Sequence, residues 1–578
     1  MLVVMTTDLY RILHTPCVFL KRSVAKGNAY YSLAESVRVD GKVMTRIIKQ
    51  LGRLSDEEAN KWNLLLRTEP HDVSRWILDT SVITTLHSYR HGTVALAHAM
   101  WKRLGMDAVV YDALSHVKGR SVSSKLIETM VVNRIDDPCS KLAMLDWMPG
   151  TSLPFILGID PTHLHANRFY RAMDALWMRR GTIERKLFDS VVSRYSGGGI
   201  VLKDLTSTYF EGMHCPMARH GHSRDHRPDR LQVSWSLVET EEGLPVTFEI
   251  YPGNTHDSKT LQASIGRIQR LFGLKSGIFV SDRGISTEEN IDTVTSAGFH
   301  YVVAETLSNI TEIVDTAIAG GLRPVDGGGD LTYADVFGED RYIVIHGGQK
   351  EIDDMAALNR ALAKGERIVA AVNDYASKHP NAGSTRMLSR AVRETEKHHL
   401  STYFDVEWNA AGKNITARQK EKVGRERRYA GYWILRTDLK DKTAAEIISI
   451  YKGLWRVERT FREIKSSLDV RPVRHRRSDR VAAHIWMCVL AYLIERIAGI
   501  DVKRMQERNS PDRQLPTVTA GTVFGAFGSI VLNEHAVKGN SKHRWFTATE
   551  LTGWHSALAE ALGIGEEMFT AEKTVQFS

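Results

Sequence analysis

The chain has 578 residues, too many for a single hydrophobic core, and its 43% apolar residues are enough to fill several. Its 77 lysines and arginines exceed its 68 acidic residues by nine, which gives a mild preference for polyanionic partners. The longest apolar stretch, residues 481–494, is too short to span a bilayer, so we expect a buried helix there and a cytoplasmic protein without a membrane segment.

The first 90 residues predict a small basic β module and a linker. Residues 18–52 alternate between apolar and polar side chains, and Asp40-Gly41 predicts a hairpin turn between two strands. Between residues 21 and 53, eight lysines and arginines face only two acidic residues. Two further basic clusters lie at residues 413–428 and 471–480, and three such clusters favour a nucleic-acid partner over ordinary solvated faces.

Residues 91–196 predict a helical region, which we expect to contribute to DNA binding, although no recognition helix can be identified. Apolar periodicity and proline punctuation place its helices at residues 94–104, 125–134, 141–147, 165–180 and 183–195.

The pattern changes to α/β from residue 197 onward. Strands are predicted at residues 200–206, 231–238, 245–251, 277–281 and 299–304, with helices at 255–271 and 287–297. Three strands, then helix, strand, helix and strand, is the order of the ribonuclease-H-like fold. We therefore expect a ribonuclease-H-like catalytic core whose first part is 197–304, a large insertion at 305–430, a second part at 431–500 that includes a strand at 432–437, and a tail at 501–578.

Residues 451–468 predict a helix that packs by one apolar stripe. Glu458 lies at the edge of this stripe, while Tyr451 and Lys465, seven residues before and after it, project almost directly below and above. An ordinary amphipathic helix with solvated charges is the alternative interpretation. The stripe consists of Leu454, Val457, Phe461, Ile464 and Leu468.

Three carboxylates are expected at one edge of this sheet. Asp204 lies within the first predicted strand, Asp282 at the end of the fourth, and Glu458 on the late helix. Taken singly, Asp204 could face solvent and Asp282 could form a turn. Together they would repel one another unless divalent cations neutralised them, and hard carboxylate oxygens are the ligands of two-metal phosphodiester cleavage.

The chain resembles the DDE transposases of bacterial insertion sequences, specifically the group with a Tyr-Arg-Glu-Lys signature helix and an insertion in the catalytic core. Tyr451, Glu458 and Lys465 match the signature spacing, whereas Leu454 occupies the arginine position and leaves that phosphate contact to Arg456 or Arg462. The similarity extends to Asn133-Arg134, Ser140-Lys141-Leu142, Lys203-Asp204-Leu205-Thr206, Gly221-His222-Ser223, Arg227-Pro228-Asp229, Gly243-Leu244-Pro245, Gly253-Asn254 and Ser281-Asp282-Arg283-Gly284.

The resemblance implies metal-dependent cleavage of double-stranded DNA at the element's ends and strand transfer into target DNA. Asp204, Asp282 and Glu458 would be the catalytic residues and would hold two Mg²⁺ ions, with Mn²⁺ as a substitute. The implied DNA contacts are Tyr451, Arg456, Arg462 and Lys465. The working form would be a homodimer on DNA. Related enzymes stack a displaced base on an aromatic residue, for which Trp408 or Trp433 would serve.

Two other functions remain open. His214, Cys215, His220, His222 and His226 could form a transition-metal site, but their spacing fits no tight zinc pattern and the interleaved arginines oppose a cation. The chain could also be a nuclease, or a domesticated DNA-binding protein of the same fold, that does not transpose.

Overall fold

The computed structural model describes residues 18–25, 28–39, 42–67, 83–197, 199–283, 286–306, 310–338, 340–509, 519–537 and 540–575. It divides into two compact units. One comprises residues 1–88 with 533–547, and the other comprises residues 89–532 with 548–578.

The smaller unit contains the predicted β module. Its three antiparallel strands are β1 (Val18–Ala25), β2 (Asn28–Val39) and β3 (Lys42–Gly52). The last pair of β2 and β3 is Val39 with Lys42, as a hairpin requires, although Asp40-Gly41 lies outside the described residues. Helix α2 (Asp56–Arg67) contributes Trp62 to a small core around Leu33.

A second three-stranded sheet joins distant parts of the chain. Strand β16 (Val531–Val537) lies between β17 (Asn540–Ala548) and β4 (Ile83–Arg90). A segment near the end of the sequence therefore pairs with one near its beginning. Sequence periodicity alone cannot identify such a partner, because the pairing is not local.

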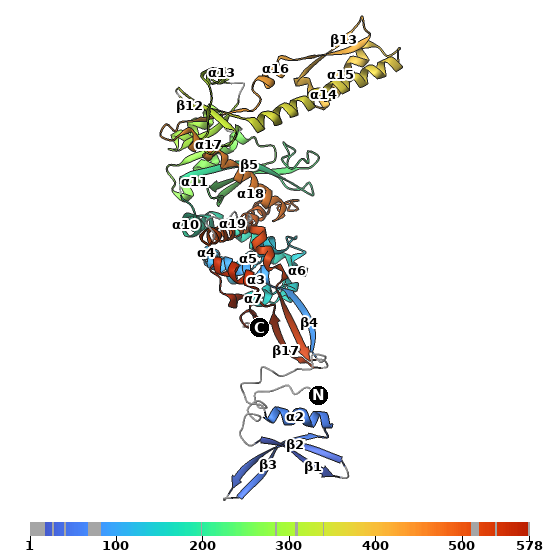
Figure 1. The fold of residues 1–578 in the computed structure, drawn as a ribbon, viewed down its shortest axis with the longest axis vertical. Helices are drawn as coiled ribbons and strands as arrows, with labels where there is room; N and C mark the ends of the chain where they lie inside the picture. Colours follow the sequence, from blue (N-terminus) through green and yellow to red (C-terminus); the bar gives the residue numbers. More distant parts are fainter. Residues whose placement is uncertain are drawn as a thin grey trace. The chain divides into compact units, whose positions relative to one another are not determined.

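The larger unit begins with a helical bundle built around one long buried helix, α19 (Ser478–Asn509) (Figure 1). This helix contains the apolar stretch 481–494, almost all of which is buried. Among the described residues, no helix has the length and apolar character needed to cross a membrane. The longer helices of the bundle are α3 (Gly92–Arg103), α4 (Met106–Ala113), α5 (Arg120–Asp136), α8 (Ala166–Met178), α9 (Arg180–Leu187) and α21 (Gly553–Ala561), and the shorter ones are α6 (Met144–Trp147), α7 (Leu153–Leu157), α10 (Ser193–Tyr195), α20 (Ala520–Ala526) and α22 (Ala571–Val575).

A nine-stranded mixed sheet forms the centre of this unit, with the strand order β10-β11-β12-β15-β9-β8-β5-β6-β7. All five strands predicted between residues 200 and 304 are present, and only the pairs β5–β8 and β8–β9 are parallel. The strands are β5 (Ile200–Tyr209), β6 (Gln232–Thr240), β7 (Pro245–Pro252), β8 (Ile278–Ser281), β9 (His300–Glu305), β10 (Arg323–Pro324), β11 (Leu331–Phe337), β12 (Arg341–Gly347) and β15 (Tyr432–Thr437).

Helices cover both faces of the first half of the sheet. Helices α11 (Leu261–Phe272) and α12 (Glu288–Ser296) pack through Ile265, Ile268 and Ile291 onto β8 and β9, whereas α17 (Ala444–Lys452) and α18 (Leu454–Ser466) belong to the main core. The chain is thus a mixed α/β protein.

The segment predicted as an insertion has two structural parts. Strands β10, β11 and β12, with α13 (Thr311–Gly320), extend the central sheet, so residues 323–347 are continuous with it. The remainder is built on α14 (Gly348–Lys378), which packs against the hairpin of β13 (Phe404–Asn409) and β14 (Asn414–Gln419) (Figure 1). A Cβ atom at Gly365 would lie 2.2 Å from the Phe404 ring, so this contact requires glycine. The other helices here are α15 (Ser384–Lys397) and α16 (Glu421–Arg428).

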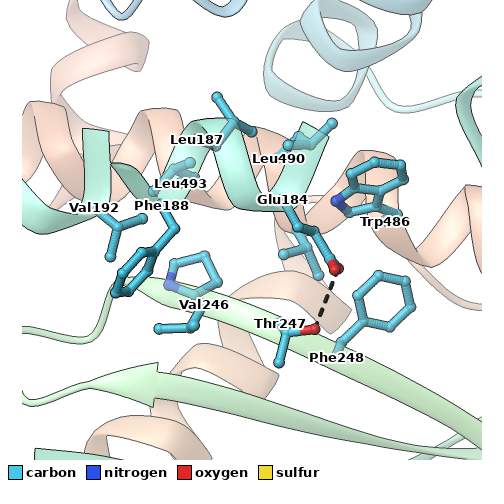
Figure 2. A pocket seen from close by; sticks show the side chains of 12 residues that line it. Glu184, Leu187, Phe188, Val192, Val246, Thr247, Phe248, Trp486, Leu490 and Leu493 are labelled. Carbon is cyan, nitrogen blue, oxygen red and sulfur yellow. Dashed lines mark hydrogen bonds between the residues drawn. The ribbon is translucent and has the colours of Figure 1, made fainter. Parts of the chain in front are cut away.

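The sheet and the helical bundle meet where β7 lies against α9 and α19. Figure 2 shows Glu184 of α9 directed at Thr247 of β7, and the Thr247 hydroxyl donates to Glu184 Oε1 at 3.3 Å. Trp486 and Phe248 lie beside this contact. The cavity between these residues has a volume of about 20 Å³, room for one water molecule, so this junction is structural.

Candidate active site

Asp204 lies in the middle of β5, on a strand that is buried almost throughout. Its carboxylate accepts a hydrogen bond of 2.7 Å from the Leu205 amide. Burial, the neighbouring Asp282 carboxylate and, to a smaller extent, Glu458 raise the pKa of Asp204 to about 7. The hydrogen bond from Leu205 and the charge of Arg224 oppose this rise. Asp204, Asp282 and Glu458 therefore lie within electrostatic reach of one another.

The position of Asp282 follows from the parallel pairing of β5 with β8. Leu202 pairs with Val280, and continuing this register by two residues places Asp282 beside Asp204. Asp282 follows the last residue of β8 and is partly exposed. Two carboxylates thus lie side by side, Asp204 in the middle of β5 and Asp282 just beyond the carboxyl end of the parallel strand β8.

The stretch predicted as one helix from residue 451 to 468 is two helices. Helix α17 ends at Lys452 and α18 begins at Leu454, with Gly453 between them. A Cβ atom at Gly453 would lie 2.9 Å from the Ile450 carbonyl oxygen of α17, which favours glycine at this junction, and it would meet Leu202 of β5 at an ordinary contact distance of 3.6 Å. The prediction of a continuous helix was therefore wrong at this junction.

Tyr451 consequently approaches the site from α17. Its pKa is raised to about 12, first by burial and then by Asp282, with Glu458 and Asp204 adding to the effect and Arg283 opposing it. The Tyr451 phenol therefore lies near all three carboxylates, even though it does not share a helix with Glu458.

Helix α18 packs as its periodicity predicts. All five stripe residues, Leu454, Val457, Phe461, Ile464 and Leu468, are buried. Phe461 meets the Trp235 ring of β6 edge to face, with 5.0 Å between centroids. Glu458 is exposed beside this stripe, where its carboxylate can be approached from solvent.

The three predicted phosphate-binding cations differ in their surroundings. Arg456 donates to the Glu241 carbonyl, so it fastens α18 to the β6–β7 turn. Lys465 is buried and donates from Nζ to Oδ1 of Asp225 at 2.8 Å. Arg462 is exposed and, among the described residues, its guanidinium has no protein partner.

Sequence reasoning missed several residues that the structure brings to this site. The Asp225 side chain is 1% exposed and pairs with both Lys465 and Arg471, and its neighbour Arg224 lies close enough to Asp204 to lower that pKa. The available signal was the Arg224-Asp225 pair, which directly follows the Gly221-His222-Ser223 motif. Glu239 of β6 is also buried beneath α18, and burial raises its pKa to about 8.

Arg134 of α5 connects the helical bundle to the end of the signature region. Its guanidinium donates to the Asp469 carbonyl at 3.3 Å and to the Asn133 side chain at 2.9 Å, and the residue is 2% exposed. The Asn133-Arg134 motif therefore fixes the chain just after α18.

The donor set of Asp204, Asp282 and Glu458 fits hard divalent cations such as Mg²⁺, since it offers only carboxylate oxygens whose mutual repulsion a cation relieves. As they stand, these carboxylates are neighbours rather than a closed ligand cluster: across the described parts of the chain, no three His, Cys, Asp or Glu side chains are grouped to hold a metal ion. The same finding applies to the histidine segment 214–226.

Trp433 of β15 lines a cavity of about 410 Å³ between the sheet and the insertion. Arg283, which follows Asp282, and Tyr432 also line it. Trp408 instead lies on β13 and packs against the insertion's own core.

Parts of the chain match models of two known protein families. A model of the transposase DDE domain matches residues 234–494, which include Asp282 and Glu458, and a model of the N-terminal domain of IS1634 family transposases matches residues 20–75. No curated protein matches. Among solved structures, a piggyBac transposase in a synaptic complex with hairpin DNA is 10% identical with a TM-score of 0.35, covering 71% of this chain and 70% of that one. By its two family models, the chain belongs to the DDE transposases of insertion sequences.

Proposed function

We propose that this chain binds the ends of its insertion sequence, cleaves DNA strands there and joins them to target DNA. The observation that carries the proposal is the meeting of Asp204, Asp282 and Glu458 from β5, β8 and α18. In the β5–β8 register, Asp282 lies beside Asp204, and the charges of Asp282 and Glu458 add to the effect of burial in raising the pKa of Asp204. Convergent carboxylates at one sheet edge are costly to maintain unless they bind cations.

The strand order supports a ribonuclease-H-like core. Within the sheet, β9-β8-β5-β6-β7 combines an antiparallel meander with two parallel strands on the far side of β5. In such a core the acidic residues of the first and fourth strands lie side by side, which is the relation of Asp204 to Asp282.

The residues of the site divide the chemical work between them. Two Mg²⁺ ions, or Mn²⁺ in their place, would activate the attacking oxygen and stabilise the leaving oxygen. Asp204, Asp282 and Glu458 would hold these ions. Tyr451 would orient the DNA backbone from the α17 side, and the exposed Arg462 would hold a phosphate one turn beyond Glu458.

The proposed partner is double-stranded DNA, both at the element's ends and at the target. The basic β module and the cations of α18 support this choice. Because joining two ends requires two active sites, we propose a homodimer on DNA. The cavity lined by Trp433 and Arg283 is large enough for a nucleobase, which supports Trp433 rather than Trp408 as the residue that stacks a displaced base.

The test is an end-cleavage assay with the purified chain. The substrate is duplex DNA that spans the border of the gene's own element, with a supercoiled plasmid as target. Mg²⁺-dependent nicking at the border, followed by joining to the plasmid, is the expected result. Cleavage without joining would indicate a nuclease, and specific binding without either reaction would indicate a domesticated DNA-binding protein.

A further inference from the structure

The loop between β5 and β6 is fastened to both elements that carry acidic residues of the site. The Arg224 amide donates to Ser207 Oγ at 2.9 Å, and Ser207 lies on β5 three residues after Asp204. The next side chain, Asp225, accepts from Lys465 Nζ at 2.8 Å, and Lys465 lies on α18 seven residues after Glu458. Arg224 is therefore held between β5 and α18.

The base of the loop is equally constrained. Arg219 and Gln232 exchange backbone hydrogen bonds of 2.9 and 3.0 Å. The side-chain amide of Gln232 donates from Nε2 to the His222 and Gly253 carbonyls. A Cβ atom on Gly221 would lie 2.1 Å from the Gly253 oxygen, so only glycine fits. These contacts make the loop a defined structural element rather than a loose connection.

Positive side chains gather around Asp225 beside the acidic site. Asp225 faces the cations of Lys465 and Arg471, and the guanidinium of Arg224 lies close to Lys465 as well. The Lys465 and Asp225 side chains are buried, whereas those of Arg224 and Arg471 are partly exposed. The charge of Arg224 also lowers the pKa of Asp204, which places this exposed cation beside the acidic site.

We propose that Arg224, held by the loop between β5 and β6, is a phosphodiester-binding residue that contacts the DNA backbone next to the bond that is cut. Asp225, Lys465 and Arg471 are positioning residues that hold Arg224 there. This proposal rests on the proposed function, because it assumes that the cleaved DNA lies along Asp204 and Glu458. It assigns Lys465 an indirect role, through Asp225, in place of direct phosphate contact.

The test compares Arg224→Ala and Arg224→Lys with Arg230→Ala, a matched control on the same loop whose arginine pairs with Asp229 at 3.3 Å. The probe is duplex DNA carrying the element border, titrated at several salt concentrations in EDTA, followed by single-turnover cleavage with Mg²⁺. For Arg224→Ala we expect the slope of log affinity against log salt to fall by about 0.9, as for the loss of one phosphate contact, and cleavage to slow about tenfold or more. Arg224→Lys should retain part of the salt slope and part of the cleavage rate, and Arg230→Ala should match the wild type in both.

Asp225→Asn tests the positioning role. Removing this negative charge does not weaken overall attraction to DNA, so we expect cleavage at saturating DNA to slow while binding is retained. The double variant Arg224→Ala with Asp225→Asn should cleave no more slowly than Arg224→Ala alone. An unchanged salt slope and cleavage rate in Arg224→Ala, or multiplicative losses in the double variant, would overturn the proposal. A wild-type chain that neither binds nor cuts border DNA would instead overturn the proposed function.

Discussion

Lys465 donates to Asp225 at 2.8 Å across 240 positions of sequence, and both side chains are buried. This ion pair connects the signature helix to the loop between β5 and β6. Its geometry indicates that the lysine of the signature sequence maintains the site from within, because its ammonium group is directed at a carboxylate of the protein.

Lys465→Met should lower the midpoint of urea unfolding, with a loss of about 2 kcal/mol, since a charged hydrogen bond disappears while Asp225 stays buried. In an Asp225→Asn background, Lys465→Met should lower the free energy of unfolding much less, or even raise it, because Lys465 there already lacks its buried anionic partner. Equal losses in the two backgrounds would show that the pair is energetically unimportant.

Arg462→Ala should weaken binding to border DNA and reduce the salt slope by about 0.9 without changing the unfolding midpoint, because the side chain is exposed and the contact we propose for it is with DNA. Arg459→Ala is the control on the same helix, since Arg459 pairs with Glu463 at 2.8 Å. An effect of equal size in both variants would remove Arg462 from the DNA contacts.

Glu239 predicts a pH dependence of stability. Burial raises its folded-state pKa to about 8, above its ordinary value, so its contribution is fully present below about pH 4.5 and is lost as the pH rises through 8. Between these limits, the ionisation of Glu239 lowers the free energy of unfolding by about 1.4 kcal/mol for each unit by which the pH rises.

Glu239→Gln should remove that slope, and unfolding midpoints between pH 5 and 8 measure it. The carboxamide can keep the hydrogen bond with Thr460, at 3.2 Å, without ionising. Glu495, whose pKa burial also raises to about 8, keeps its own slope in this variant. A slope that is the same in Glu239→Gln and the wild type would contradict the assigned ionisation.

Much of the central fold could be predicted from local patterns. The apolar runs around Asp204 and Asp282 identified β5 and β8, and the stripe from Leu454 to Leu468 identified the buried face of α18. These signals are local, because a strand or helix reports its own buried face in its periodicity.

The remainder depended on contacts that periodicity does not contain. The break at Gly453 leaves no mark in the apolar periodicity, and the pairing of Lys465 with Asp225 joins segments that are far apart in sequence. Likewise, strands β10, β11 and β12 extend the central sheet through partners that only the folded chain supplies. The order of strands and helices led to the prediction that the three acidic residues are neighbours, but it did not indicate which residues hold them in place.

The most direct test of the whole account is Mg²⁺-dependent cleavage of border DNA by Asp204→Asn, Asp282→Asn and Glu458→Gln, beside the control Glu463→Gln on the same helix as Glu458. We predict that each of the first three abolishes cleavage while binding to border DNA stays within a few-fold of the wild type, and that Glu463→Gln still cleaves. Normal cleavage by any of the three site variants would contradict the assignment of these carboxylates as the catalytic residues.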